Sequence, residues 1–91
     1  MTQHKATFEI INQLGLHARA AAQLVRIANS YPCSVSLSCT GETVNAKSIM
    51  GVLMLAVAKG MHISLHCEGE GAEACLQAIG RLIQNRFGEP R

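Results

Sequence analysis

The chain has 91 residues, which suits one compact domain and is too short for two. Apolar residues make up 48% of the sequence and aromatic residues only 3%, so the core has to consist mainly of aliphatic side chains. The net charge of +2, with scattered basic residues, argues against nucleic-acid binding. There is no secretory signal and no apolar run of membrane-spanning length, so we expect a cytoplasmic protein without membrane insertion.

The first part of the chain predicts a strand, a turn and a helix. Residues 6–10 alternate between apolar and polar side chains, as a half-buried strand does. Turn-forming residues follow at 12–15, and residues 18–29 then repeat apolar side chains at helical spacing. The sequence Ser-Tyr-Pro at 30–32 ends this helix, because the residue before a proline resists the helical conformation.

The middle of the chain predicts a hairpin and a short helix. Residues 33–39 alternate clearly, and residues 42–45 return as a short strand after a tight turn. Ser48 is placed as the N-cap of a helix over residues 49–55. Gly60 is interpreted as the glycine that closes this helical segment.

The last part predicts one more strand and helix. Residues 61–67 alternate again, residues 72–86 have a helical apolar face, and residues 88–91 are expected to fray. The whole chain, residues 1–91, is then a single α+β domain with the order β-α-β-β-α-β-α. Each strand is apolar on one face only, which favours an antiparallel sheet with helices on one face and solvent on the other. The open face is polar, so we expect a monomer.

Cysteine and histidine spacing predicts no metal site. The four cysteines form no Cys-x-x-Cys pair, and Cys33 and Cys39 lie about 20 Å apart if they share a strand. We expect all four to be buried, reduced thiols. His62 and His66 share a strand face at a separation of about 13 Å, too far to hold one ion.

His17 is the strongest candidate for chemistry. It stands where the first helix begins, in the sequence Gly-Leu-His-Ala-Arg at 15–19. The first N–H groups of a helix lack partners within it and favour an anion, and the positive helix end opposes protonation of the imidazole. An unprotonated imidazole beside an anion pocket can attack phosphorus, and Arg19 can pair with phosphate oxygens. The alternative is that His17 is an ordinary cap or surface residue.

Two segments resemble one known family. Asn-x-x-Gly-Leu-His-Ala-Arg at 12–19, followed by apolar residues at 21–25, resembles the active-site signature of the HPr family of the phosphoenolpyruvate phosphotransferase system. Lys-Ser-Ile-Met-Gly-Val at 47–52 is similar to the family's regulatory-serine segment. The resemblance spans residues 5–87 and implies an open-faced β-sandwich, with four antiparallel strands and three helices on one face.

The resemblance also implies roles for single residues. His17 would accept a phosphoryl group from enzyme I on Nδ1 and pass it to a IIA-type protein, and Arg19 would stabilise that group. Ser48 would be a target of an HPr kinase/phosphorylase, with the alternative that it is only an N-cap. The chain would act as a stoichiometric carrier without a cofactor, since no nucleotide loop or paired carboxylates support an independent enzyme.

One position departs from the family pattern. Family members commonly have proline after the active-site arginine, whereas this chain has Ala20, which restores a backbone N–H in the first turn. Alanine here is also similar to the nitrogen-branch paralogues called NPr. The sequence therefore leaves the carbohydrate and nitrogen branches open, with a regulatory module acting through its phosphorylation state as the second hypothesis.

The second helix predicts a docking surface. It is nearly all apolar, and a helix on a two-layer domain buries only one face, so an apolar patch should stay exposed beside the site. The alternative is a short core helix without a partner role. The residues assigned to the surface are Leu16, Arg26, Lys47, Ile49, Met50 and Leu53.

Overall fold

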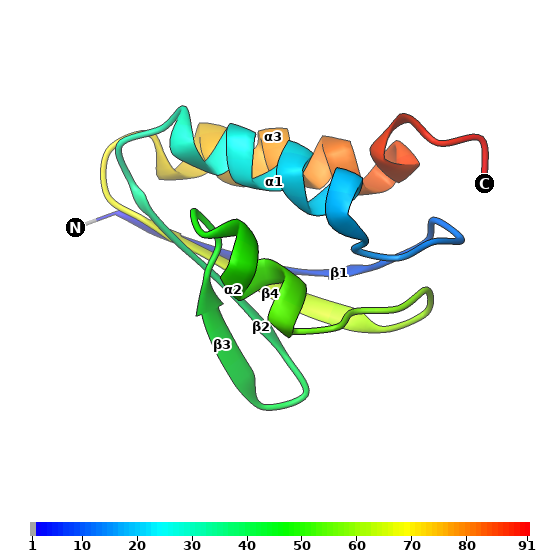
Figure 1. Cartoon of the computed structure of the whole chain (residues 1–91). Coiled ribbons are helices and arrows are strands. Elements are labelled where there is room, and N and C mark those ends of the chain that lie inside the picture. Colours follow the sequence, from blue (N-terminus) through cyan, green and yellow to red (C-terminus); the bar gives the residue numbers. More distant parts are fainter. Residues whose placement is uncertain (1) are drawn as a thin grey trace.

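The structure is a computed structural model that describes residues 2–91. Its elements follow the expected order (Figure 1). The strands are β1 (Gln3–Glu9), β2 (Ser34–Cys39), β3 (Glu42–Asn45) and β4 (His62–Glu68). The helices are α1 (Ala18–Asn29), α2 (Ile49–Met54) and α3 (Ala72–Gln84), followed by a 3-10 turn, Arg86–Gly88.

The four strands form one antiparallel sheet in the order β1-β4-β2-β3. Leu65 of β4 lies at its centre, opposite Ala6 of β1 on one side and Leu37 of β2 on the other. The expected four-stranded antiparallel sheet and the three-helix arrangement are confirmed. Strands β1 and β3 form the edges of the sheet. The two central strands, β4 and β2, have a neighbour on each side, and they are also the most hydrophobic.

The helices cover one face of the sheet (Figure 1). Helix α3 packs on β1 and β4, α1 packs beside α3, and α2 contacts α1 and β3. The core between sheet and helices is aliphatic, as the composition requires. Its largest fully buried apolar side chains are Ile10, Leu24, Leu37, Val52, Ile63, Leu65, Ile79 and Ile83.

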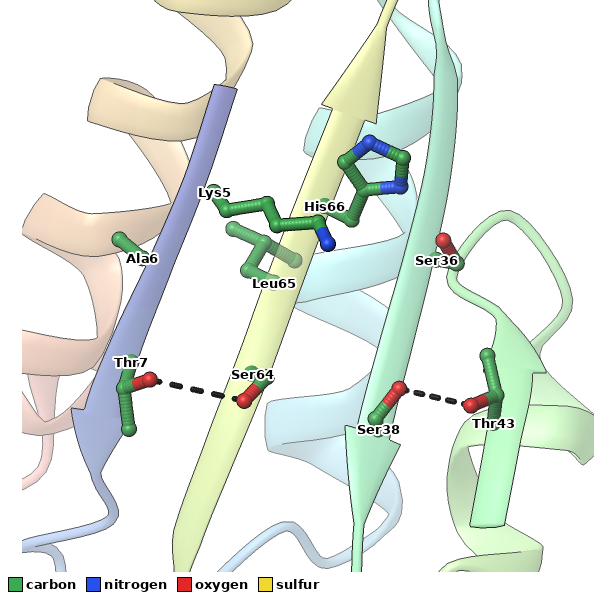
Figure 2. Close-up of a pocket in the computed structure, with 9 residues that line it drawn as sticks. All are labelled: Lys5, Ala6, Thr7, Ser36, Ser38, Thr43, Ser64, Leu65 and His66. Carbon is green, nitrogen blue, oxygen red and sulfur yellow. Dashed lines mark hydrogen bonds between the residues drawn. The ribbon is translucent and has the colours of Figure 1, made fainter. Parts of the chain in front are cut away.

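The other face of the sheet is open and polar (Figure 2). Hydroxyl side chains follow one another across the strands, with Thr7 bonded to Ser64 at 3.5 Å and Ser38 bonded to Thr43 at 2.8 Å. The expected polar face is confirmed. No helix among residues 2–91 has both the length and the apolar character needed to cross a membrane.

Three local predictions are wrong, and the first of them is the end of α3, which lies at Gln84 rather than at residue 86. Gly60 does not close α2, which ends at Met54 with Leu55 as its C-cap. Ala56 takes the left-handed conformation beyond that cap, with φ 52°, and Gly60 instead lies in the turn before β4, where its N–H donates to Ile10. The tail after residue 88 is also not frayed, because it folds back onto the start of α1.

Candidate functional site

His17 is the N-cap residue of α1, with extended backbone angles. Its carbonyl accepts the N–H of Ala21 at 2.8 Å, which is the first bond of the helix. The N–H groups of Ala18, Arg19 and Ala20 precede that bond, so they have no partner within the helix and favour an anion at this end of it. The side chain of His17 is 27% exposed, so a phosphoryl donor can reach it.

Gly15 sets the path of the chain into His17. Its φ of +66° lies in the left-handed region that suits glycine, and a Cβ built on it would lie 2.5 Å from the carbonyl oxygen of Val57. Leu16 donates its N–H to the same carbonyl at 2.9 Å. The residues before His17 are therefore fixed against the segment that follows α2.

Asn12 connects this loop to the C-terminal tail. Its side chain is fully buried, and its Nδ2 donates to the carbonyl of Gly15 at 2.8 Å and to Oε1 of Glu89 at 3.1 Å. A single amide group thus holds both the turn before His17 and the carboxylate that lies next to it.

Glu89 completes the site through its second oxygen, because Oε2 accepts a hydrogen bond from Nε2 of His17. Arg86 and Phe87, both with positive φ, turn the chain back after α3, and Phe87 anchors this turn by being 97% buried. The N–H of Gln13 donates to the carbonyl of Arg91 at 3.0 Å, which fastens the tail beyond Glu89.

The contact with Glu89 determines which nitrogen of His17 can react. An ionised carboxylate only accepts hydrogen bonds, so Nε2 must carry the proton. In the neutral ring, Nδ1 then keeps its lone pair and is the nucleophilic nitrogen. The hydrogen bond from His17, and next that from Asn12, lower the pKa of Glu89, and the charge of Arg19 acts in the same direction. Glu89 is therefore ionised at neutral pH.

Comparisons with known proteins show the family of this chain. The sequence profile described as "PTS HPr component phosphorylation site" matches residues 4–85. The chain belongs to the HPr family.

Individual HPr proteins are similar over nearly the whole chain. The phosphocarrier protein HPr of Pseudomonas aeruginosa is 53% identical over 81 residues, covering 88% of this chain and 90% of that protein. HPr of Xylella fastidiosa (strain Temecula1) is 44% identical over 89 residues, covering 98% of each chain. The crystal structure of HPr-C-His from Thermoanaerobacter tengcongensis has a TM-score of 0.94 and 39% identity, covering 97% of this chain and 99% of that chain.

The HPr family is the family that the signature at residues 12–19 and the segment at residues 47–52 had suggested, so the resemblance is confirmed. HPr proteins are phosphocarriers of the phosphotransferase system, and the expected open-faced sandwich is the fold of the matched HPr structures. The sequence missed two residues of the site, Asn12 and Glu89. Asn12 lies within the signature, but nothing in the sequence places Glu89 beside His17.

Arg19 and Ala20 lie in the first turn of α1 on different sides of it. Arg19 is exposed, and its charge reaches Glu89, so it is available to an anion beside His17. Ala20 is fully buried and packs into the core, where its methyl group faces away from the anion site. Its N–H remains a donor that a proline would lack.

Ser48 is the N-cap of α2, as predicted. Its Oγ accepts the N–H of Gly51 at 3.1 Å, and the residue is exposed. Replacing Ser48 with alanine leaves this N–H without its partner, so we expect the free energy of unfolding to fall by about 1 kcal/mol. Urea denaturation of Ser48→Ala checks this, and Ser34→Ala on the open sheet face, where the serine is exposed, serves as a surface control. An unchanged midpoint would contradict the capping role.

The exposed apolar patch that the sequence predicted on α2 is present in part. Met50 is 66% exposed and Ile49 39%, whereas Leu53 is half-buried. Leu16 is 4% exposed and belongs to the core, so its assignment to the surface is wrong: its backbone is held against Val57 and its side chain points inward. Residues missed by the sequence are Ile11, Leu14 and Met54, which are 38%, 67% and 75% exposed.

The two basic residues of this surface differ in their contacts. Arg26 is exposed in the last turn of α1. Lys47 is half-buried, and its Nζ donates to the carbonyl of Tyr31 at 2.8 Å, which ties the turn after α1 to the start of α2. Arg26 is therefore the freer of the two charges.

Glu89→Gln tests the role of the tail at the active site. Glutamine keeps the size of the side chain but removes its charge. The amide group can also donate a hydrogen bond to an unprotonated Nε2 of His17, so the tautomer that carries the proton on Nε2 is no longer favoured. We expect phosphoryl transfer to slow by about tenfold, the usual cost of losing one charge-assisted hydrogen bond. Single-turnover transfer kinetics and ¹⁵N chemical shifts of His17 measure both effects. Glu73→Gln on α3 is the control, and equal behaviour of the two variants would contradict the role of Glu89.

Proposed function

We propose that this chain accepts a phosphoryl group from enzyme I on Nδ1 of His17 and passes it to IIA-type proteins of a phosphotransferase system. The observation that supports this most strongly is the hydrogen bond from Nε2 of His17 to Glu89. It leaves Nδ1 as the free nucleophile at the N-terminal end of α1. Transfer in this scheme is stoichiometric, and the chain has no turnover chemistry of its own.

The residues around His17 fit both states of such a carrier. Nδ1 attacks phosphorus, a P–N bond forms, and the bond from phosphorus to the donor breaks. The ring then carries a positive charge, which the carboxylate of Glu89 stabilises through Nε2–H. The phosphoryl oxygens gain the N–H groups of the first turn of α1 and the guanidinium of Arg19 as donors.

Phosphorylation by phosphoenolpyruvate and enzyme I tests the proposal. We expect the intact mass to rise by one phosphoryl group, and we expect acid to remove it, because phosphohistidine is acid-labile. Adding a IIA-type protein should move the group onto that protein. A chain that gains no phosphoryl group from its own enzyme I would contradict the proposal.

We also propose that the exposed apolar side chains near His17 bind both partners. Met54 on α2 lies three residues before Val57, whose carbonyl accepts the N–H of Leu16, and Leu14 lies on the loop before His17. Pro90 and Arg91 of the tail lie beside Leu14. Apolar residues therefore lie near His17 on two sides, a pattern typical of docking surfaces.

Met54→Asp tests this surface. A charge in the docking patch should raise the concentration needed for half-maximal phosphoryl transfer by about tenfold, as the loss of a central interface contact does. The free energy of unfolding should change by less than about 0.5 kcal/mol, because Met54 is exposed. Titration of the transfer rate measures the first effect. Gln77→Asp on α3 introduces the same charge elsewhere, and an equal effect of both variants would contradict the docking role.

A second function is regulation. Ser48 has an exposed hydroxyl at the start of α2, beside Met50 and Ile49 of the proposed docking surface. A phosphate there would place negative charge on the surface that partners approach. We propose Ser48 as the acceptor for an HPr kinase/phosphorylase; an acid-stable adduct formed with ATP and lost in Ser48→Ala supports this, and no labelling contradicts it.

The protein that accepts the phosphoryl group from this chain distinguishes the carbohydrate branch of the phosphotransferase system from the nitrogen branch. We propose a cytoplasmic, monomeric carrier of the carbohydrate branch, with a regulatory module of the nitrogen branch as the alternative. Transfer from phosphorylated chain to a sugar-specific IIA protein supports the first. Transfer only to a nitrogen-branch IIA protein supports the alternative.

A further inference from the structure

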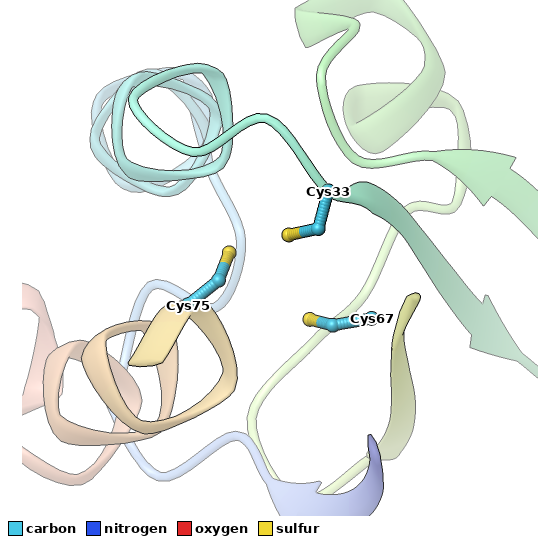
Figure 3. Close-up of side chains that lie close together, drawn as sticks. All are labelled: Cys33, Cys67 and Cys75. Carbon is cyan, nitrogen blue, oxygen red and sulfur yellow. The ribbon is translucent and has the colours of Figure 1, made fainter. Parts of the chain in front are cut away.

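Three cysteines that are distant in sequence converge in the core (Figure 3). Cys33 directly precedes β2, Cys67 lies in β4, and Cys75 lies in the first part of α3. Their Sγ atoms all lie within 4.8 Å of one another, and each residue is at most 1% exposed. The expectation of buried thiols is confirmed, but spacing along the sequence gave no sign of this cluster.

The chemistry of the cluster restricts what it can bind. The donors grouped within residues 2–91 are three sulfurs, without a histidine or carboxylate among them, so a three-coordinate thiophilic centre fits best. Burial raises the pKa of Cys67 and Cys75, which keeps these two thiols neutral. A divalent ion with three thiolates would leave a net negative charge in an apolar core, which is costly.

We propose that Cys33, Cys67 and Cys75 form a binding site for trivalent arsenic, taken up from arsenous acid as a neutral trithiolate. Three As–O bonds break and three S–As bonds form. Each thiol proton leaves with one hydroxyl group as water, so the site releases three waters. Neither arsenic nor sulfur changes oxidation state, and no charge is buried.

The distances suit this product. A three-coordinate centre with bonds of about 2.3 Å, a length typical of metal–sulfur bonds, places its sulfurs about 3.4–4.0 Å apart. The sulfurs lie within 4.8 Å of one another, so small side-chain rotations bring them into position. The backbone frame of two strands and a helix can remain unchanged.

Two turns pack against each other at Cys33. A Cβ built on Gly69 would lie 3.5 Å from Cα of Cys33, and one built on Gly71 would lie 3.3 Å from the ring of Tyr31. The turns after α1 and after β4 therefore lie against each other next to one member of the cluster. Local opening of such turns requires less free energy than opening the sheet, so binding should be slow but accessible from the folded state.

The cluster is separate from the phosphoryl site. Cys33 follows the C-terminal end of α1, whereas His17 precedes its N-terminal end, and the 12-residue helix between them is about 18 Å long. Binding of arsenic should therefore leave phosphorylation of His17 unchanged. This independence makes the two functions separable by experiment.

The test uses the full chain, reduced and kept without oxygen, with sodium arsenite as the probe. We expect native mass spectrometry to show one added arsenic atom less three hydrogens, and the melting temperature to rise because the ligand binds the folded state. X-ray absorption of the complex should show three sulfur neighbours and no oxygen. Cys75→Ala should weaken binding by at least about tenfold, since only two sulfurs remain.

Cys39→Ala is the matched control. Cys39 is also a buried core cysteine, but it lies at the far end of β2, outside the cluster. It should bind arsenite as the unchanged chain does. Equal binding by Cys39→Ala and Cys75→Ala, an absence of any adduct, or arsenic bound through two sulfurs and an oxygen would overturn the proposal. So would tight binding of zinc in place of arsenite.

Discussion

Replacement of His17 with alanine is expected to abolish phosphoryl acceptance. Nδ1 is the nucleophile in the proposed transfer, so its removal should lower incorporation from phosphoenolpyruvate and enzyme I by at least about 1,000-fold. The side chain is partly exposed, and its truncation should cost only about 1 kcal/mol of unfolding free energy, so the variant stays folded. Intact mass measured after incubation gives the phosphorylated fraction directly.

Two of the other histidines, His62 and His66, supply the control. His62 and His66 lie in β4 on the open face of the sheet, away from α1. His62→Ala and His66→Ala should each be phosphorylated as fully as the unchanged chain. Phosphorylation that persists in His17→Ala, or that disappears in His66→Ala, would place the acceptor elsewhere.

Gly15→Ala is expected to cause the largest loss of stability among the variants considered. The added methyl group overlaps the carbonyl of Val57 and also forces alanine into a left-handed conformation. We expect the free energy of unfolding to fall by about 2–4 kcal/mol. Phosphoryl transfer should also slow, because Asn12 donates to the Gly15 carbonyl and orients Glu89. Urea denaturation and transfer kinetics measure the two effects.

Gly60→Ala separates the overlap from the backbone conformation. Gly60 has a φ of +90°, but a Cβ built on it meets no atom within 4 Å. Alanine there should cost only about 1 kcal/mol, from the backbone conformation alone. Equal losses in Gly15→Ala and Gly60→Ala would mean that Val57 moves aside and that the turn before His17 is not rigid.

Much of the fold follows from patterns within short windows of sequence. Helix α1 has the predicted bounds, 18–29, because apolar residues recur at helical spacing and Pro32 soon follows the last turn. Strand β3 also has its predicted bounds, and the alternation in β2 and β4 gives the correct buried face. These elements were predictable because the spacing of apolar residues in each of them matches the side that the element buries.

The errors arise where distant contacts decide the local structure. Glycine commonly ends helices, but α2 ends earlier at Met54, and Gly60 serves the turn into β4. Helix α3 was predicted to reach residue 86, but it ends at Gln84, because burial of Phe87 requires the chain to reverse. The positive φ of Arg86 and Phe87, which makes this reversal, has no simple signal in the sequence.

The candidate site was predictable only on its helical side. His17 and Arg19 lie in one local motif at a helix start, so their proximity follows from the sequence. Glu89 lies 72 positions from His17, and its approach depends on the reversal of the chain after α3 and on the amide of Asn12. The cysteine cluster could not be predicted from the sequence for the same reason, since its members come from three segments that are distant in the chain.

The nitrogen of His17 that becomes phosphorylated tests the account most directly. Heteronuclear NMR of the ¹⁵N-labelled chain, phosphorylated by phosphoenolpyruvate and enzyme I, distinguishes the two ring nitrogens. Nε2 carries a proton and donates a hydrogen bond to Glu89. The account therefore predicts a phosphoryl group on Nδ1 and a proton retained on Nε2. Phosphorylation on Nε2, which would displace Glu89, would contradict it.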